Sequence, residues 1–153
     1  MTMVPHIYDP SFWLRITVSV ICGLVIGAER QVRGKAVDIR TSILICLGTM
    51  LFIYLGLQIH GETDHARVLG QVVTGIGFIG AGVIMTRDGL VSGVTSAAVV
   101  WILAGIGAAV GFGFYDVAIV ICLLTSIILV GMERFERRYK VFPRGTHSHK
   151  KED

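Results

Sequence analysis

Hydrophobic residues occur along the chain in five long blocks that short polar segments separate. The blocks cover roughly residues 11–28, 41–58, 68–86, 93–111 and 114–132. Each approaches the about 20 residues that a helix needs to cross the hydrocarbon core of a bilayer. In lipid the backbone must satisfy its own amide groups, and a helix does so. We therefore predict an all-α fold, a polytopic membrane bundle of about five transmembrane helices.

Composition excludes an ordinary water-soluble domain. The chain has 153 residues, of which 53% are hydrophobic and only 16% are charged. A soluble domain of this size would leave too much of that apolar surface in water. The lipid bilayer is therefore the first predicted partner.

The distribution of basic residues predicts how the chain is oriented. Arg30, Arg33, Lys35 and Arg40 lie between the first two blocks, whereas segment 60–67 contains a single Arg. Short loops rich in Lys and Arg stay on the cytoplasmic side of a membrane. We predict that the N-terminus lies outside and the C-terminus lies in the cytoplasm.

The chain divides into a predicted membrane domain, residues 1–135, and a basic cytoplasmic tail, residues 136–153. Seven of the 14 Lys and Arg residues lie between Arg134 and Lys151. Basic residues beside an apolar helix favour contact with anionic lipid headgroups, and we do not expect nucleic acid as a partner.

Side chains that could carry chemistry form no recognisable active site. Cys22, Cys46 and Cys122 lie inside hydrophobic blocks, without His or Asp at metal-ligand spacing, so we interpret them as small buried hydrophobic residues. A disulfide or a metal site is the alternative. No Ser or Thr lies near a His and Asp pair, and we predict a protein that is not an enzyme and has no cofactor other than, at most, magnesium.

Glycines are frequent in the third block. Segment 75–80 matches the letters GxGxxG, but it lies inside an apolar span rather than after a strand, so a dinucleotide site is rejected. Glycines let membrane helices approach closely. We predict that the third helix is central and packs through its glycines, and that Gly23 and Gly27 of the first helix form a partner face. The third-helix residues are Gly70, Gly75, Gly77, Gly80 and Gly82; Gly105, Gly107, Gly111 and Gly113 suit close packing of the fourth.

Charges at the inner ends of the first two helices are the main candidate for a functional cluster. An anion at a helix C-terminus, Glu29, and a cation at a helix N-terminus, Arg40, are each unfavourable alone. We predict that they form an ion pair and that Asp38 caps the second helix. The predicted cluster is Glu29, Arg30, Asp38, Arg40, Thr41 and Asp88. A hydrated magnesium ion would suit such carboxylates; the alternative is that the charges only tie the first loop to the bundle.

Transport is the second functional hypothesis. No charged residue lies near the middle of a block, so the sequence offers no charged relay across the membrane. A pore lined by hydroxyl groups, those of Thr74, Thr95 and Ser96, is the alternative.

Several motifs together resemble the membrane domain of the MgtC/SapB family. They are Gly27–Arg30 followed by Ile39–Thr41, then Gly75–Ile84, then Gly93–Ala98 leading to Trp101. They occur in the family's order and cover roughly residues 12–135.

The resemblance implies a multi-pass protein of the bacterial inner membrane. Family members are linked to adaptation to low magnesium, acid or host-cell stress, including virulence, and some resemble inhibitors of the F-type ATP synthase. We therefore expect a non-enzymatic regulator that binds another membrane complex or forms homo-oligomers, with a transporter of magnesium or another cation as the alternative. Asp38 departs from the Gly common in the family at that position, and the soluble C-terminal domain of longer members is not expected.

Overall fold

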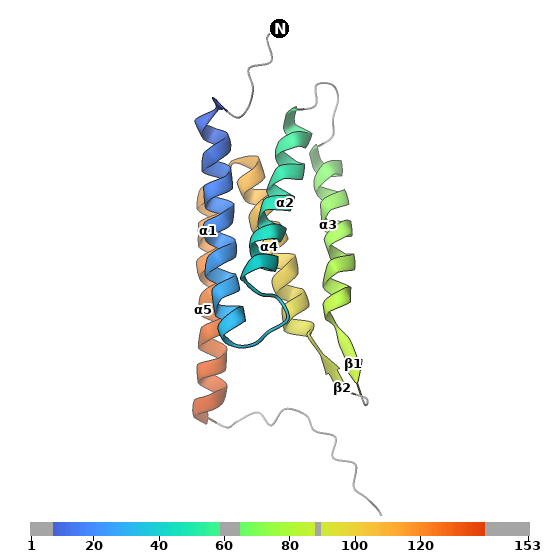
Figure 1. The fold of residues 1–153 in the computed structure, drawn as a ribbon, viewed down its shortest axis with the longest axis vertical. Helices are drawn as coiled ribbons and strands as arrows, with labels where there is room; N and C mark the ends of the chain where they lie inside the picture. Colours follow the sequence, from blue (N-terminus) through green and yellow to red (C-terminus); the bar gives the residue numbers. More distant parts are fainter. Residues whose placement is uncertain (1–7, 59–64, 88–89, 140–153) are drawn as a thin grey trace, which may run out of the picture.

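The computed structural model describes residues 8–58, 65–87 and 90–139, which form five helices and one hairpin (Figure 1). All five helices are long and apolar enough to cross a membrane. The predicted all-α class is confirmed, and the orientation of the termini stays a prediction. The elements are α1 (Pro10–Val32), α2 (Ile39–Gln58), α3 (His65–Val83), β1 (Met85–Arg87), β2 (Leu90–Ser92), α4 (Val94–Phe112) and α5 (Tyr115–Tyr139).

Helix α1 begins and ends for local reasons. Asp9 caps it, since its Oδ1 accepts a hydrogen bond from the backbone N–H of Ser11 at 2.9 Å, and Pro10 occupies the first turn, where no N–H is needed. At its other end α1 runs past its hydrophobic block as far as Val32. Glu29 and Arg33 form an ion pair one turn apart there, with 2.7 Å between Oε1 and Nε.

The central helix is α4, which packs against each of the other four helices. It meets α2 closely because Gly107 and Gly111 lie on the shared face. A Cβ added at Gly107 would overlap the carbonyl oxygen of Cys46, and one added at Gly111 would lie 2.7 Å from Cβ of Ile53. The predicted packing role of these two glycines is confirmed.

Helices α1 and α2 are also held at backbone contact by glycine. A Cβ at Gly23 would lie 2.7 Å from Cα of Ile43, and one at Gly27 would lie 2.6 Å from Cα of Ile39. The predicted small-residue face of α1 is therefore real, but the helix that packs on it is α2 rather than α3.

The prediction of a central α3 is wrong for the single chain. Helix α3 lies at one edge of the bundle (Figure 1) and is the least buried of the five spans. A Cβ added at its Gly80 would only touch α4, 3.7 Å from the carbonyl oxygen of Ala97. Open space surrounds the Cβ position of the other glycines assigned to α3: Gly70, Gly75, Gly77 and Gly82.

Two further glycines of α4 differ from expectation. Gly105 has nothing within 4 Å of its Cβ position, so it makes no close packing contact. Gly113 has a φ of +89°, in the left-handed region that favours glycine, and its N–H bonds to the carbonyl oxygen of Val110. Its role is therefore to end α4 rather than to pack against another helix.

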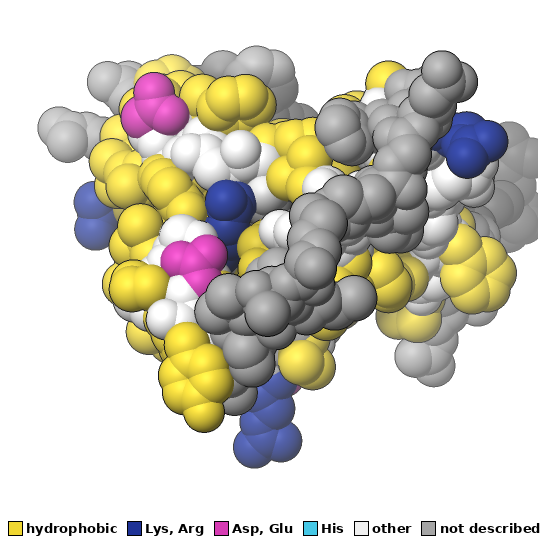
Figure 2. Space-filling model, turned by 90° about the horizontal axis from the view of Figure 1, so that it is seen from above, with side chains coloured by type: hydrophobic (Ala, Val, Ile, Leu, Met, Phe, Trp, Pro, Cys, Tyr) yellow, Lys and Arg dark blue, Asp and Glu magenta, His cyan; other side chains and the backbone are white. Residues whose placement is uncertain are grey.

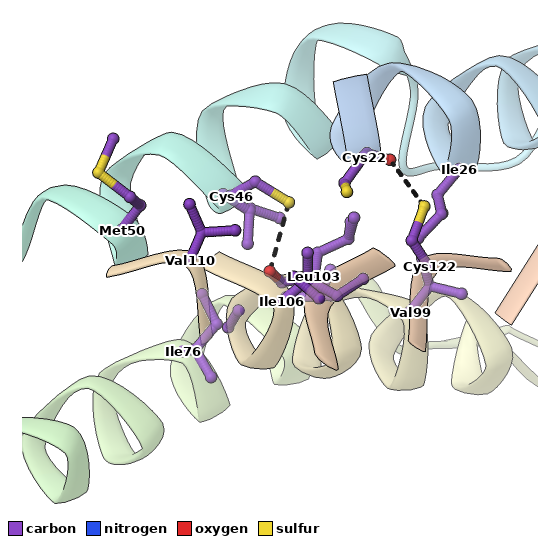
Figure 3. Close-up of a cluster of buried hydrophobic side chains, with 14 of the residues drawn as sticks. Cys22, Ile26, Cys46, Met50, Ile76, Val99, Leu103, Ile106, Val110 and Cys122 are labelled. Atoms are coloured by element: carbon purple, nitrogen blue, oxygen red, sulfur yellow. Dashed lines mark hydrogen bonds between the residues drawn. The ribbon is translucent and has the colours of Figure 1, made fainter. Parts of the chain in front are cut away.

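The core is apolar and contains all three cysteines (Figure 3). The Cys46 thiol donates to the carbonyl oxygen of Leu103, with an S–O distance of 3.3 Å, and the Cys122 thiol donates to that of Cys22 at 3.7 Å. All three cysteines are free and buried. The interpretation of them as buried hydrophobic residues is confirmed.

The outer surface of the bundle is also apolar. In the end view of Figure 2, hydrophobic side chains reach the edge of the molecule and charged ones are scattered among them. Phe52, Phe78 and Ile127 are each more than half exposed. Such a surface suits the hydrocarbon of a bilayer rather than water.

Glycine-to-alanine substitutions distinguish glycines at close helix contacts from those on the open face of α3. We expect Gly27→Ala to destabilise the purified chain by about 1–3 kcal/mol, because the new methyl group meets the backbone of α2. Gly77→Ala places its methyl group in open space, and we expect unchanged or slightly higher stability. Thermal unfolding in detergent, followed by helical circular dichroism, measures both. Equal losses for the two variants would contradict this packing.

Candidate ligand site at the basic end

Four basic residues gather at one end of the bundle. Arg30, Arg33, Lys35 and Arg40 lie at the end of α1, in the α1–α2 loop and at the start of α2. The β-hairpin that joins α3 to α4 is at the same end (Figure 1). We refer to this end, defined by those four basic residues, as the basic end.

A hollow of about 500 Å³ opens at the basic end, and we refer to it as the basic-end pocket. Its polar wall comes from Glu29, Arg30 and Lys35 and from the start of α4, with Thr95 and Ser96. Its apolar wall comes mainly from α5, with Ile128, Leu129 and Met132. Three segments far apart in sequence therefore meet around it.

Arg30 is the most deeply placed charge of the pocket, with 3% of its surface exposed. Its Nη2 donates to Oγ of Ser96 at 2.7 Å, which joins the end of α1 to the first turn of α4. Its Nε is buried without a hydrogen-bond partner. A buried guanidinium that uses only part of its donor set is costly unless another group completes it.

The predicted ion pair between Glu29 and Arg40 does not form. Arg40 is exposed, and Glu29 pairs with Arg33 instead. The physical reason is that α1 continues to Val32, which puts Arg33 one turn beyond Glu29 on the same side of the helix. The other carboxylate oxygen of Glu29, Oε2, is buried and accepts no hydrogen bond from the part of the chain that the structure describes.

Asp38 caps α2, as predicted. Its Oδ1 accepts a hydrogen bond from the backbone N–H of Thr41 at 2.8 Å, and Ile39 is the first helical residue. The backbone and side-chain hydrogen bonds from Thr41 lower the pKa of the Asp38 carboxyl group below its usual value. Asp38 therefore has a structural role of its own.

The predicted cluster is divided by the structure. Glu29 and Arg30 line the basic-end pocket, whereas Asp38 and Arg40 do not, and Thr41 lines a groove between α2 and α3. Asp88 lies outside the described residues. No metal cage of three or more His, Cys, Asp or Glu side chains occurs within residues 8–58, 65–87 and 90–139.

The hydroxyl groups proposed to line one pore do not lie together. Thr95 and Ser96 join Glu29 and Arg30 at the basic-end pocket, while Thr74 lies on the exposed face of α3 and donates to its own helix, to the carbonyl oxygen of Gly70. The sequence did contain a signal that Thr95 and Ser96 lie near Glu29 and Arg30. Thr95 and Ser96 are at the start of the fourth hydrophobic block, and this start was predicted to lie on the same side of the membrane as the end of the first block.

Lys35 of the pocket wall was not singled out from the sequence. It lies in the α1–α2 loop, where Gly34 adopts a φ of +62° and the Lys35 N–H bonds to the carbonyl oxygen of Arg30 at 3.0 Å. This turn folds the loop back to the end of α1. A loop lysine carries no periodic signal, so only the three-dimensional structure assigns it to the site.

Arg15, near the other end of the bundle, has a structural role. Its Nη1 donates to the carbonyl oxygens of Val110 and Gly111 at 2.9 and 2.6 Å, and its guanidinium lies 5.4 Å from the ring centre of Tyr54. A cation is favourable at a helix C-terminus, where carbonyl groups lack partners. Arg15 therefore acts as a C-terminal cap on α4.

Comparisons with known proteins identify relatives across most of the chain. A model of the MgtC family matches residues 16–138. The Escherichia coli K12 protein named "Putative magnesium transporter YhiD" is 39% identical over 127 residues, which cover 77% of this chain and 59% of that protein. Protein SrpB of Synechococcus elongatus is 33% identical over 137 residues, 80% of this chain and 75% of SrpB.

A third relative is the protein MgtC of Salmonella typhimurium LT2. It is 36% identical over 132 residues, which cover 84% of this chain and 54% of that protein. The chain therefore spans less than two thirds of the length of YhiD and of MgtC. No solved structure matches the chain.

The cap on α2 makes a testable contribution to stability. Because the folded-state pKa of Asp38 is lowered, its charge stabilises the fold above the ordinary Asp pKa of 3.8, and this stabilisation is lost as the pH falls through the folded-state pKa. We expect Asp38→Ala to lower the Tm at pH 7, and Asp38→Asn to retain most of the cap. Thermal unfolding in detergent between pH 7 and pH 3 measures both.

The difference in Tm between the native chain and Asp38→Asn should disappear toward the acidic end of that range. A difference that stays constant with pH would show that the charge of Asp38 is not what stabilises α2.

Proposed function

Because the chain belongs to the MgtC family of multi-pass membrane proteins, we propose that it is a non-enzymatic regulator that acts by binding another complex in the bacterial inner membrane. The observation that carries this proposal is the surface of α3. It has the features of a helix that packs against a partner, yet the described residues of the chain supply none there.

Small residues form a continuous stripe along the exposed face of α3. Gly70, Thr74, Gly77 and Ala81 follow one another at spacings of four, three and four residues, which places them on one side of a helix. All four are exposed, and nothing approaches the Cβ positions of the two glycines. In membranes such stripes let a second helix approach at backbone distance.

Comparison with α5 supports a protein partner for α3 rather than lipid alone. Both spans are little buried in the single chain, but α5 has the highest mean hydropathy of the five and α3 has the lowest. A helix surrounded by hydrocarbon gains nothing from glycine, which costs about 1 kcal/mol relative to alanine in a helix. The composition of α3 fits contact with another protein, whereas that of α5 fits contact with acyl chains.

The middle of the bundle supports regulation over conduction through a single chain. The described part of the core there is filled by Cys46, Met50, Leu103, Ile106 and Val110, all essentially buried. An ion would have to lose its water shell in this region without oxygen ligands to replace it.

Transport stays the second candidate because of the groove between α2 and α3. This groove has a volume of about 740 Å³, and among its mostly apolar lining Thr41, Thr49 and Gln71 occupy successive depths along the helices. The Escherichia coli relative is named for magnesium transport. A second protein that closed the open side of the groove would complete a path lined in part by oxygen atoms.

Disrupting the stripe tests the regulatory proposal. We expect Gly77→Leu to leave the fold and the Tm of the purified chain intact but to reduce crosslinking to its partner complex in native membranes about tenfold or more. Val120→Leu on the exposed side of α5 is the control and should retain the crosslink. Mass spectrometry of the crosslinked species identifies the partner, for which the family resemblance indicates the F-type ATP synthase or a second copy of this chain.

Reconstitution in liposomes tests the alternative. Under the regulatory proposal the purified chain carries no magnesium flux above that of empty liposomes, measured with an entrapped fluorescent indicator. A robust flux that Glu29→Ala abolishes, together with unchanged crosslinking in Gly77→Leu, would overturn it in favour of transport.

A further inference from the structure

Two positive groups meet at the floor of the basic-end pocket. Helix α4 begins there, and the aligned peptide dipoles give a helix N-terminus a partial positive charge. Arg30 lies against this same turn through its bond to Ser96, and 97% of its surface is buried, since only 3% is exposed. A buried cation at the positive end of a helix is unfavourable unless an anion lies between them or beside them.

The first turn of α4 supplies no anion of its own. Its N-cap is Gly93, which makes no side-chain cap, and the first turn contains no acidic residue. The first helical hydrogen bond runs from the N–H of Ala97 to the carbonyl oxygen of Gly93 at 2.9 Å. The N–H groups of Val94, Thr95 and Ser96 precede it and face the end of the helix, as in helix termini that bind phosphate.

The charged side chains at the pocket are predominantly positive. Among the described residues, Glu29 is the one carboxylate in the pocket wall; its Oε1 pairs with Arg33 at 2.7 Å, and its Oε2 is buried without a hydrogen-bond partner. Arg30 and Lys35 both line the pocket, and the Nε of Arg30 has no hydrogen-bond partner. Among the described residues, Arg30, Arg33 and Lys35 therefore stand against one carboxylate, that of Glu29, so positive charge is in excess beside the start of α4.

The opposite wall of the pocket is hydrocarbon-like. Ile128 and Met132 of α5 are 60% and 54% exposed, and both line the pocket beside the polar wall. An inorganic anion would leave this wall uncovered. A ligand with an anionic head and apolar chains would cover both walls at once.

We propose that the basic-end pocket is a phospholipid site, in which Arg30, Lys35 and the first turn of α4 bind the phosphate and α5 carries an acyl chain. The proposal is carried by two observations together: the buried Arg30 guanidinium, whose Nε has no hydrogen-bond partner, lies against a helix N-terminus that has no side-chain cap. It is independent of the proposed regulation, because it concerns the isolated chain and a different helix surface from the α3 stripe.

Lipid-dependent stability measures this binding directly. We expect phosphatidylglycerol, titrated into the delipidated full chain in a neutral detergent, to raise the Tm in a saturable manner. Diacylglycerol, which has the acyl chains without the phosphate, and inorganic phosphate, which has the anion without the chains, should each have far weaker effects. Equal effects of diacylglycerol would overturn the phosphate site, and equal effects of inorganic phosphate would overturn the lipid as its source.

Variants at exposed positions keep the test independent of folding. Lys35→Gln removes one cation without disturbing a buried contact, and we expect about a tenfold or greater loss of apparent affinity for phosphatidylglycerol. Thr95→Glu adds a tethered carboxylate at the start of α4. It should raise the Tm of the lipid-free chain and abolish the response to lipid, because it supplies the missing anion itself.

Arg40→Gln is the matched control. Arg40 lies at the same end of the bundle and is exposed, but it does not line the pocket, so this variant should bind the lipid as the native chain does. An equal loss of affinity in Arg40→Gln and Lys35→Gln would show general attraction to a basic surface and overturn a specific site. A lipid response that survives unchanged in Thr95→Glu would also overturn it.

Discussion

Backbone contact at glycine is the interaction on which this bundle depends. In a bilayer, helices gain little from hiding apolar side chains from one another, because lipid chains are equally apolar. Cohesion must come from close packing. Here α1 packs closely against α2 at Gly23 and Gly27, and α4 packs closely against α2 at Gly107 and Gly111. Helices α1, α2 and α4 thus form a tight body, against which α3 and α5 pack by side chains.

The buried ends of this body are held by arginine in two opposite ways. Arg15 meets the C-terminus of α4, where its charge and the free carbonyl groups attract each other. Arg30 meets the N-terminus of the same helix, where the charges repel and only the hydroxyl of Ser96 mediates. Both guanidinium groups leave Nε without a hydrogen-bond partner among the described residues, so the two arginines differ in the sign of the helix end that they meet. The unfavourable sign at Arg30 distinguishes an arginine that fits an anion site from a structural one.

The positions of the helices could be predicted from the sequence because span length and hydropathy are properties of each segment alone. The Asp38 cap and the glycine face of α1 could also be predicted, because they depend on neighbouring residues. The predicted central position of α3 and the predicted Glu29–Arg40 ion pair were wrong, because both depend on which helix surfaces pack together in the folded chain. A glycine with a partner and one without, such as Gly27 and Gly77, look alike in sequence. The pocket was reached in part, since Glu29, Arg30, Thr95 and Ser96 were named, but in separate groups.

The two proposed sites lie on different parts of the fold, and this separation has a functional consequence. The phospholipid site belongs to α1, α4 and α5, whereas the stripe of small residues and the groove belong to α3 and its boundary with α2. Helix α3 joins α4 through the hairpin, and the end of α3 lies so close to the start of α4 that a Cβ added at Gly93 would overlap the backbone of Val83. A phosphate bound at the first turn of α4 would therefore stabilise the junction between the hairpin and α4, to which the end of α3 is attached. The two sites share no residue, so any coupling between lipid binding and partner binding has to pass through this junction and through the packing of α3 against α4 and α2.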